Sequence, residues 1–167
     1  MGQVIVRKRV YIETSIPSYL TARKSANVKA MVWQEITSQW WETARTDYDL
    51  FVSDLVIVEA QAGDREAAAR RIEPLRGIRI LPVGMETREF ADQLISQGAI
   101  PAAAKADALH IAVAAMHRID YLLTWNFRHI NNAAKKPIIR SICADSGHPC
   151  PEICTPMELL PENDNHV

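Results

Sequence analysis

The side chains best suited to chemistry in this sequence are three acids and one amide, spread along most of the chain. They are Glu13, Glu59, Asp107 and Asn126. Carboxylate and amide oxygens suit hard divalent cations, and magnesium usually takes one or two carboxylates, several waters and the phosphate oxygens of a substrate. A cation held in this way lowers the pKa of an attacking water and neutralises a phosphate. The set is therefore suited to phosphodiester hydrolysis.

The segments around these residues alternate between strand and helix patterns. Apolar, β-rich runs predict strands at 9–12, 50–52, 78–83 and 121–124, and a fifth strand is expected at 138–143. Apolar residues at three- and four-residue steps predict a helix at 27–45, and Ser53 and Thr87 as caps predict helices at 53–59 and 87–98. Alanine-rich composition predicts helices at 65–71 and 101–117, the second opened by Pro101. Pro17 predicts a turn after the first strand. This alternation predicts a three-layer α/β/α fold around a parallel sheet of four to five strands.

This topology predicts that the four polar residues meet. Ligands in open α/β sheets bind outside the carboxyl ends of the strands. Glu13 and Asn126 follow predicted strands, and Glu59 lies early in the helix that leaves the second strand. Asp107 lies near the start of a helix that runs antiparallel to the strands, so it belongs at the same edge.

Composition indicates one domain without a membrane segment. The chain has 167 residues, 48% hydrophobic and 23% charged, so a single domain over 1–160 with a polar tail at 161–167 is expected. The longest apolar stretch, 106–116, is shorter than a membrane span and contains Asp107 and His110. No secretory signal is recognisable, which favours the cytoplasm. The net charge of -1 gives no overall basic field, although a nuclease needs only a local basic rim.

Four sequence blocks carry a family resemblance. VYIETS, SDLVIVEA, KADALHIAVA and DYLLTWN occur in that order. Together they resemble the conserved blocks of the PIN-domain family, especially the VapC-like ribonuclease toxins of toxin–antitoxin pairs. The resemblance extends from Arg9 to Leu160 and is specific as a set.

The resemblance implies an endoribonuclease that uses Mg²⁺ or Mn²⁺, with RNA as substrate, a small antitoxin protein as partner and a homodimeric state. By position, Glu13, Glu59, Asp107 and Asn126 match the acidic quartet of the family, and Thr14 matches the hydroxyl residue that often follows the first acid. In the family the first position is commonly aspartate and the fourth is often aspartate. The two departures favour an alternative, a catalytically degenerate PIN fold that binds RNA or a protein.

Other polar residues near the blocks have supporting interpretations. His110 lies one turn after Asp107, where it could hydrogen-bond that residue or a phosphate, and it is expected to be a supporting residue rather than a general acid or base. Lys105, Arg128 and His129 flank the expected cleft, where they could contact RNA phosphate or simply be solvated.

The remaining chemistry-bearing residues have structural interpretations. Cys143, Cys150 and Cys154 with His148 match no common zinc spacing, so reduced thiols are expected. Trp40 and Trp41 could stack on bases, but packing or a partner interface is the simpler interpretation. A small-molecule enzyme of doubly wound type is the weakest alternative, because no glycine-rich phosphate loop follows any strand.

Overall fold

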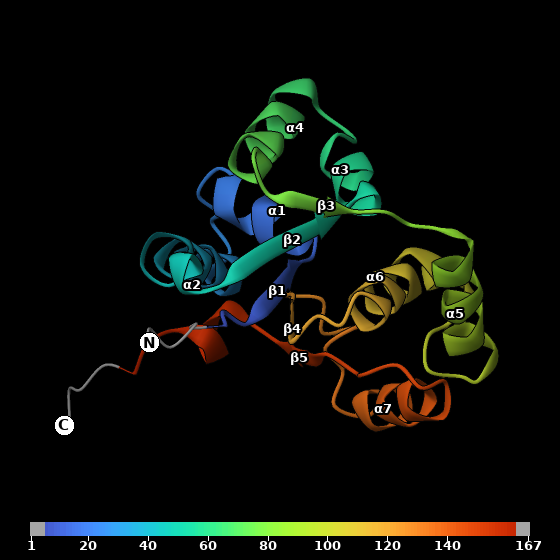
Figure 1. Ribbon diagram of the computed structural model, residues 1–167. Helices are drawn as coiled ribbons and strands as arrows, with labels where there is room; N and C mark the ends of the chain where they lie inside the picture. Colours follow the sequence, from blue (N-terminus) through green and yellow to red (C-terminus); the bar gives the residue numbers. More distant parts are fainter. Residues whose placement is uncertain (1–5, 163–167) are drawn as a thin grey trace.

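A five-stranded parallel sheet forms the centre of the molecule. The computed structural model describes residues 6–162 (Figure 1). The strand order is β3-β2-β1-β4-β5, with every pair parallel. The strands are β1 (Arg9–Ile12), β2 (Asp49–Ser53), β3 (Arg79–Leu81), β4 (Tyr121–Leu123) and β5 (Glu152–Cys154). The first strand is therefore central, with β2 and β4 on either side.

Helices cover both faces of the sheet, which confirms the predicted three-layer α/β/α architecture. Figure 1 shows α1, α2 and α4 grouped on one side, and α5, α6 and α7 on the other. The helices are α1 (Ser15–Thr21), α2 (Val28–Thr43), α3 (Asp54–Ala60), α4 (Arg65–Ile72), α5 (Met85–Ser96), α6 (Lys105–Met116) and α7 (Lys136–Asp145). Among the described residues, no helix has the length and apolar character needed to cross a membrane.

Burial is deepest along β1 and α6. Val10, Tyr11 and Ile12 are completely buried. Residues 108–115 of α6 are all buried, because this helix packs between the sheet and α5. Its many alanines add little bulk, which suits the close packing of α6 against α5. The two elements that carry Glu13 and Asp107 are thus among the most rigidly packed parts of the fold.

The prediction of a fifth strand at 138–143 was wrong. The segment 138–143 is part of helix α7, not a strand, and Ile139, Ile142 and Cys143 bury one helical face at three- and four-residue spacing. The fifth strand is instead Glu152–Cys154, a three-residue strand at the edge of the sheet that pairs with β4. So short a strand leaves too little alternation in the sequence to be recognised.

Two helix starts also differ from the prediction. The expected turn after β1 is the short helix α1, in which Pro17 lies within the first turn. Proline is tolerated there because the first-turn N–H groups have no partner inside the helix. Thr87 does not cap α5, which begins at Met85 after Gly84, and its side chain is buried within the helix. By contrast, Ser53 caps α3 as predicted, accepting from the Val56 N–H.

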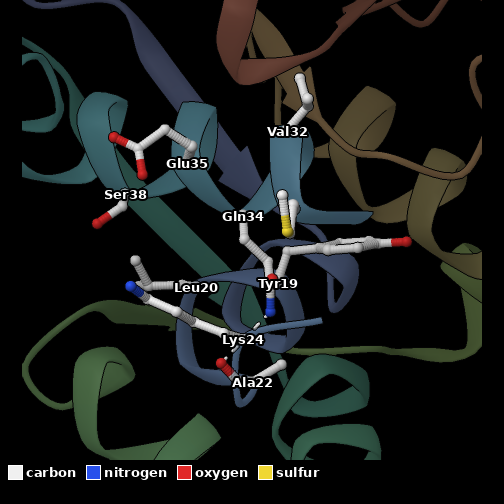
Figure 2. Close-up of a pocket in the computed structure, with 9 residues that line it drawn as sticks. Tyr19, Leu20, Ala22, Lys24, Val32, Gln34, Glu35 and Ser38 are labelled. Carbon is white, nitrogen blue, oxygen red and sulfur yellow. Dashed lines mark hydrogen bonds between the residues drawn. The ribbon is translucent and has the colours of Figure 1, made fainter. Parts of the chain in front are cut away.

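A surface groove lies between the end of α1 and the exposed face of α2 (Figure 2). Tyr19 and Leu20 line it from α1, and Met31 and Val32 from α2. The Gln34 amide closes one part of it by donating to the Arg23 carbonyl at 2.9 Å. None of the four predicted chemical residues lines this groove.

Candidate active site

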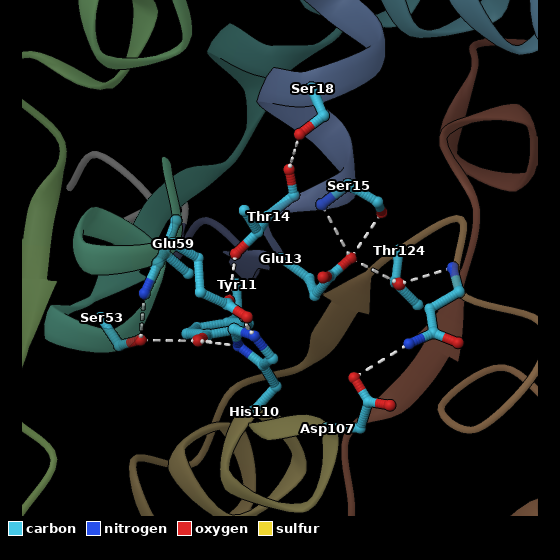
Figure 3. A network of polar contacts seen from close by, with 12 residues as sticks. Tyr11, Glu13, Thr14, Ser15, Ser18, Ser53, Glu59, Asp107, His110 and Thr124 are labelled. Carbon is cyan, nitrogen blue, oxygen red and sulfur yellow. Dashed lines mark hydrogen bonds and ion pairs between the residues drawn. The ribbon is translucent and has the colours of Figure 1, made fainter. Parts of the chain in front are cut away.

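The fold brings Glu13, Glu59 and Asp107 together at the edge of the sheet where the carboxyl ends of β1, β2 and β4 lie (Figure 3), and Asn126 is there too, bonded to Asp107. Glu13 directly follows β1, Glu59 lies in α3 after β2, and Asp107 is in the first turn of α6. Asn126 follows β4 and is joined to Asp107 by a hydrogen bond. The predicted convergence of these side chains is therefore present in the structure.

Glu13 is a buried carboxylate, only 6% exposed. Its Oε2 accepts from the Ser15 N–H at 3.0 Å, the Ser15 hydroxyl at 2.5 Å and the Thr124 hydroxyl at 2.7 Å. A buried charge is costly unless donors replace the lost water, and these three bonds do so on one oxygen. No residue within 6–162 donates to Oε1, so this oxygen is available to a ligand.

Glu59 is held by two donors at its Oε1. The Thr14 hydroxyl donates to it at 2.6 Å, and His110 Nε2 lies 2.7 Å away. Burial alone raises the pKa of Glu59, but the hydrogen bonds from His110 and Thr14 and the His110 charge outweigh burial and lower it. The second oxygen, Oε2, has no hydrogen-bond donor among the described residues. Glu59 is thus held as an anion with one oxygen available.

Asp107 and Asn126 form the third part of the site. Asn126 Nδ2 donates to Asp107 Oδ1 at 3.0 Å, and His129 Nδ1 lies 2.7 Å from Asp107 Oδ2. The orientation of the Asn126 amide is fixed at its other end, because its Oδ1 accepts from the His129 N–H at 3.1 Å. The Asn126 N–H donates to the Thr124 hydroxyl at 2.9 Å. Thr124 therefore links the Asp107–Asn126 pair to Glu13.

His110 supports Glu59 rather than its helix neighbour Asp107. The ring is completely buried, with Nε2 on Glu59 and Nδ1 2.7 Å from the Tyr11 hydroxyl. Burial opposes the charged imidazolium, but the Glu59 hydrogen bond and the charges of Glu13, Glu59 and Asp107 together raise the pKa of His110. Tyr11 in turn contacts the Ser53 hydroxyl at 2.7 Å. Both ring nitrogens are engaged by the protein, which fits a positioning residue.

The carboxylate and amide oxygens of the site are suited to a hard divalent cation, but among residues 6–162 they are not arranged as a complete set of protein ligands. In the described part of the chain, no group of three or more histidine, cysteine, aspartate or glutamate side chains is arranged to hold a metal ion. Direct sharing of one cation by Glu13, Glu59 and Asp107 is therefore not preformed. Magnesium takes one or two carboxylates and fills its other positions with water and phosphate. The free oxygens of Glu13 and Glu59 suit that mode of binding, and a closed cage of protein ligands does not form here.

The other predicted residues have different environments. Thr14 is at the site, through its bond to Glu59. His129 is also there, on Asp107, whereas Lys105 forms an ion pair with Asp92 of α5 at 3.0 Å. Arg128 is exposed beside the site.

The remaining chemistry-bearing side chains lie elsewhere. Trp40 and Trp41 are both buried, which confirms that they serve packing. The three cysteines have free thiols.

Ser15, Thr124 and Tyr11 complete the site, and sequence reasoning missed them. Ser15 and Thr124 both donate to Glu13, and Tyr11 holds His110. A signal existed for the first two, because each hydroxyl stands within two residues of a candidate acid or amide. No such signal existed for Tyr11, because a tyrosine in an apolar strand is an ordinary core residue.

These features define an open α/β/α protein with an acidic site at the carboxyl edge of its sheet. The sequence model of the PIN domain matches residues 10–136, well over half of the chain. The chain belongs to the PIN domain family. No curated protein sequence matches it.

Two solved structures have the same fold at low sequence identity. Mycobacterium tuberculosis VapC20, described as a sarcin-ricin loop cleaving toxin, superposes with a TM-score of 0.57 at 16% identity, covering 74% of this chain and 95% of that one. A chain of Rickettsia felis VapBC2, solved with a DNA fragment from its promoter, gives 0.57 at 15% identity, covering 88% and 98%. At such identities the likeness concerns the fold.

Proposed function

We propose that this protein is a metal-dependent endoribonuclease and the toxin of a toxin–antitoxin pair. The observation that carries the proposal is the hydrogen-bonded network that connects Glu13, Thr124, Asn126 and Asp107 at the sheet edge, with Glu59 held beside it by Thr14. Glu13 and Glu59 each present a carboxylate oxygen to which no residue within 6–162 donates, and such oxygens suit a divalent cation.

The residues of the chain would divide the work as follows. Glu13 and Glu59 would bind Mg²⁺ or Mn²⁺ through their free oxygens, and Asp107 would contribute its charge, oriented by Asn126 and His129. When bound, the ion supplies activation of water and charge neutralisation at the phosphate. Thr124 and Ser15 hold Glu13, and Thr14 and His110 hold Glu59, so both glutamates are fixed before substrate arrives.

The biological setting is proposed from the family and its solved members. Similarity of fold to VapC20 supports RNA as the substrate, and similarity to VapBC2 supports a small antitoxin partner. A homodimer and a cytoplasmic location are proposed on the same basis.

Cleavage of RNA by the purified protein tests the proposal. The wild type should cut single-stranded RNA with added Mn²⁺ or Mg²⁺, and excess EDTA should stop the reaction. Asp107→Asn should abolish cutting while the circular dichroism spectrum stays native. Asp92→Asn is the matched control, because it makes the same chemical change on the exposed face of α5 and should leave cutting intact. Unchanged cutting by Asp107→Asn would remove Asp107 from the site.

A second candidate function is a binding module with the same fold and no catalysis. Both Asp107 oxygens are already occupied by protein groups, and no three-ligand metal group is preformed among the described residues, which favours this alternative. Titration with Mn²⁺ in a calorimeter separates the two. A catalytic protein should bind the ion in a way that Glu59→Gln weakens, and a pure binding module should show no such binding.

A further inference from the structure

Four aromatic side chains form a continuous cluster beside the candidate active site, here called the aromatic shelf: Tyr19, Trp33, Trp125 and Phe127. The rings of Trp33 and Trp125 are stacked, with centroids 5.1 Å apart and an interplanar angle of 12°. Phe127 lies 5.5 Å from Trp33, and Tyr19 packs edge-on against Trp33 at 5.4 Å. The shelf combines α1, α2 and the segment after β4.

The shelf is directly connected to the site. Asn126, which holds Asp107, stands between two shelf residues in the chain. The Trp125 N–H donates at 2.8 Å to the Ser15 hydroxyl, which itself donates to Glu13. The shelf and the candidate site are therefore neighbours in the fold, joined through Ser15 and Asn126.

Exposure differs sharply along the shelf. Trp125 is 5% exposed and anchored, because its Nε1 donates to Thr37 at 2.8 Å. Phe127 is 43% exposed, whereas Phe51 and Phe90 are 3% exposed each. The chain thus buries its other two phenylalanines and presents this one to solvent on a rigid tryptophan base. An exposed aromatic face beside an anionic site suits a flat ligand that stacks.

The shelf also carries positive charge. The Lys29 ammonium lies 4.9 Å from the centroid of the Trp33 ring, and Arg128 directly follows Phe127. Neither cation forms an ion pair with a carboxylate in residues 6–162. Phosphate groups on either side of a stacked base would meet these cations, whereas an uncharged aromatic ligand would not use them.

We infer that the aromatic shelf binds an unpaired RNA base next to the phosphate that is cut, with Phe127 as the stacking surface and Lys29 and Arg128 as phosphate contacts. The inference deepens the proposed nuclease function and rests on it for the identity of the substrate. A base inside a duplex is stacked on its neighbours and cannot offer its face to Phe127. The shelf therefore selects single-stranded RNA, such as a loop or an end.

Binding of fluorescently labelled RNA, measured by anisotropy in EDTA to prevent cutting, tests this inference apart from catalysis. Three probes of equal length are compared: a single strand, the same strand in a duplex, and a ribose-phosphate strand without bases. The wild type should bind the single strand most tightly. Phe127→Leu keeps an apolar side chain but removes the ring, and should weaken single-strand binding by about tenfold. Binding of the baseless strand should be unchanged.

Two further variants make the result specific. Phe127→Tyr keeps the ring and should restore single-strand affinity to within about twofold of wild type. Met85→Leu, at another exposed apolar position, on α5, is the matched control and should have no effect. Equal affinity of wild type and Phe127→Leu for the single strand overturns the inference, and so does an equal loss for the baseless strand or no binding at all. The last result would leave a protein partner as the occupant of the shelf.

The outcomes also distinguish this inference from the nuclease proposal. If the protein cuts RNA with Mn²⁺ but its affinity for single-stranded RNA does not depend on Phe127, the role of the shelf is rejected and the nuclease proposal stands. If affinity for single-stranded RNA depends on Phe127 but no RNA is cut, the nuclease proposal is rejected and the shelf remains as an RNA-binding surface.

Discussion

The hydroxyl of Thr124 donates to the Glu13 carboxylate at 2.7 Å and at the same time accepts from the Asn126 N–H at 2.9 Å. This completely buried side chain therefore couples the end of β1 to the end of β4. It fixes the first acid and the amide of the candidate site relative to each other.

Replacement of Thr124 by valine tests this coupling. Thr124→Val keeps the side-chain shape but leaves Glu13 short of a donor and the Asn126 N–H without its acceptor, so the free energy of unfolding should fall by about 1–3 kcal/mol. Urea denaturation measures the loss. Thr43→Val, at an exposed position of α2, should change stability by less than about 0.5 kcal/mol. Equal effects of the two substitutions would show that the buried hydroxyl contributes nothing.

Replacement of His110 tests its role as a positioning residue. His110→Phe keeps a ring but removes both polar contacts, to Glu59 and to Tyr11, and should destabilise the protein by about 2–3 kcal/mol. If His110 acts only through Glu59, the RNA cleavage rate should fall, and the acid side of its pH profile should move to higher pH because His110 lowers the pKa of Glu59. Disappearance of one limb of the pH profile in a residually active variant would instead make His110 a proton donor or acceptor in the reaction.

The sequence predicted the position of the site more completely than its internal contacts. Strand β1 and the four residues gathered at the sheet edge were predicted, because alternation of strands and helices determines which ends meet. The hydrogen-bond partner of His110 was not predicted. The sequence suggested its helix neighbour Asp107, three residues away, whereas the ring contacts Glu59, which is fifty-one residues away in the chain. Only the packing of α6 against β1 decides which of the two carboxylates the ring reaches.

The errors in the fold have a similar origin. The apolar residues of 138–143 fit either a strand or one helical face, and the tertiary position of the segment beyond β4 decides between them. Helix α1 was hidden by Pro17, which signals a turn in most contexts and is harmless in a first helical turn. The aromatic shelf joins α2 to the segment after β4, so no local pattern reveals it.

Asp120 should make stability depend on pH in the acid range. The Asp120 carboxylate accepts from the Arg9 N–H at 2.8 Å and from the Lys8 ammonium at 3.0 Å. Burial is the largest single influence and raises the pKa of Asp120, but these hydrogen bonds and the charges of Lys8 and Arg9 together outweigh burial and lower the pKa below its ordinary value of 3.8. Because the folded pKa is the lower one, the contribution to stability is complete above the unfolded pKa and is lost as the pH falls through the folded pKa.

Comparison of wild type with Asp120→Asn measures this contribution. At about pH 7 the variant should be less stable by about 1 kcal/mol, a modest value because the side chain is partly exposed. As the pH falls below the folded pKa of Asp120, the two proteins should converge in stability. A stability difference that stays constant from neutral to acid pH would show that the charge of Asp120 is not what stabilises the contact.

Divalent ions should stabilise the folded protein if the acidic site binds them. At a Mn²⁺ concentration of about one hundred times the dissociation constant, binding adds about 2.7 kcal/mol to the free energy of unfolding, which raises the melting temperature by several degrees. EDTA should reverse the shift. Glu59→Gln should reduce it, and Glu66→Gln on the exposed face of α4 should not. A melting temperature insensitive to Mn²⁺ in the wild type would count against a metal site.

The cleavage rates of Glu59→Gln, Asp107→Asn and the double variant, measured with Mn²⁺ on one single-stranded RNA, test most directly whether these side chains form one catalytic site. Residues that act as a unit have non-additive effects, so each single variant should lose nearly all cutting and the double variant should lose little more. Single variants that cut at close to the wild-type rate, while retaining native circular dichroism, would contradict a nuclease site at this edge of the sheet.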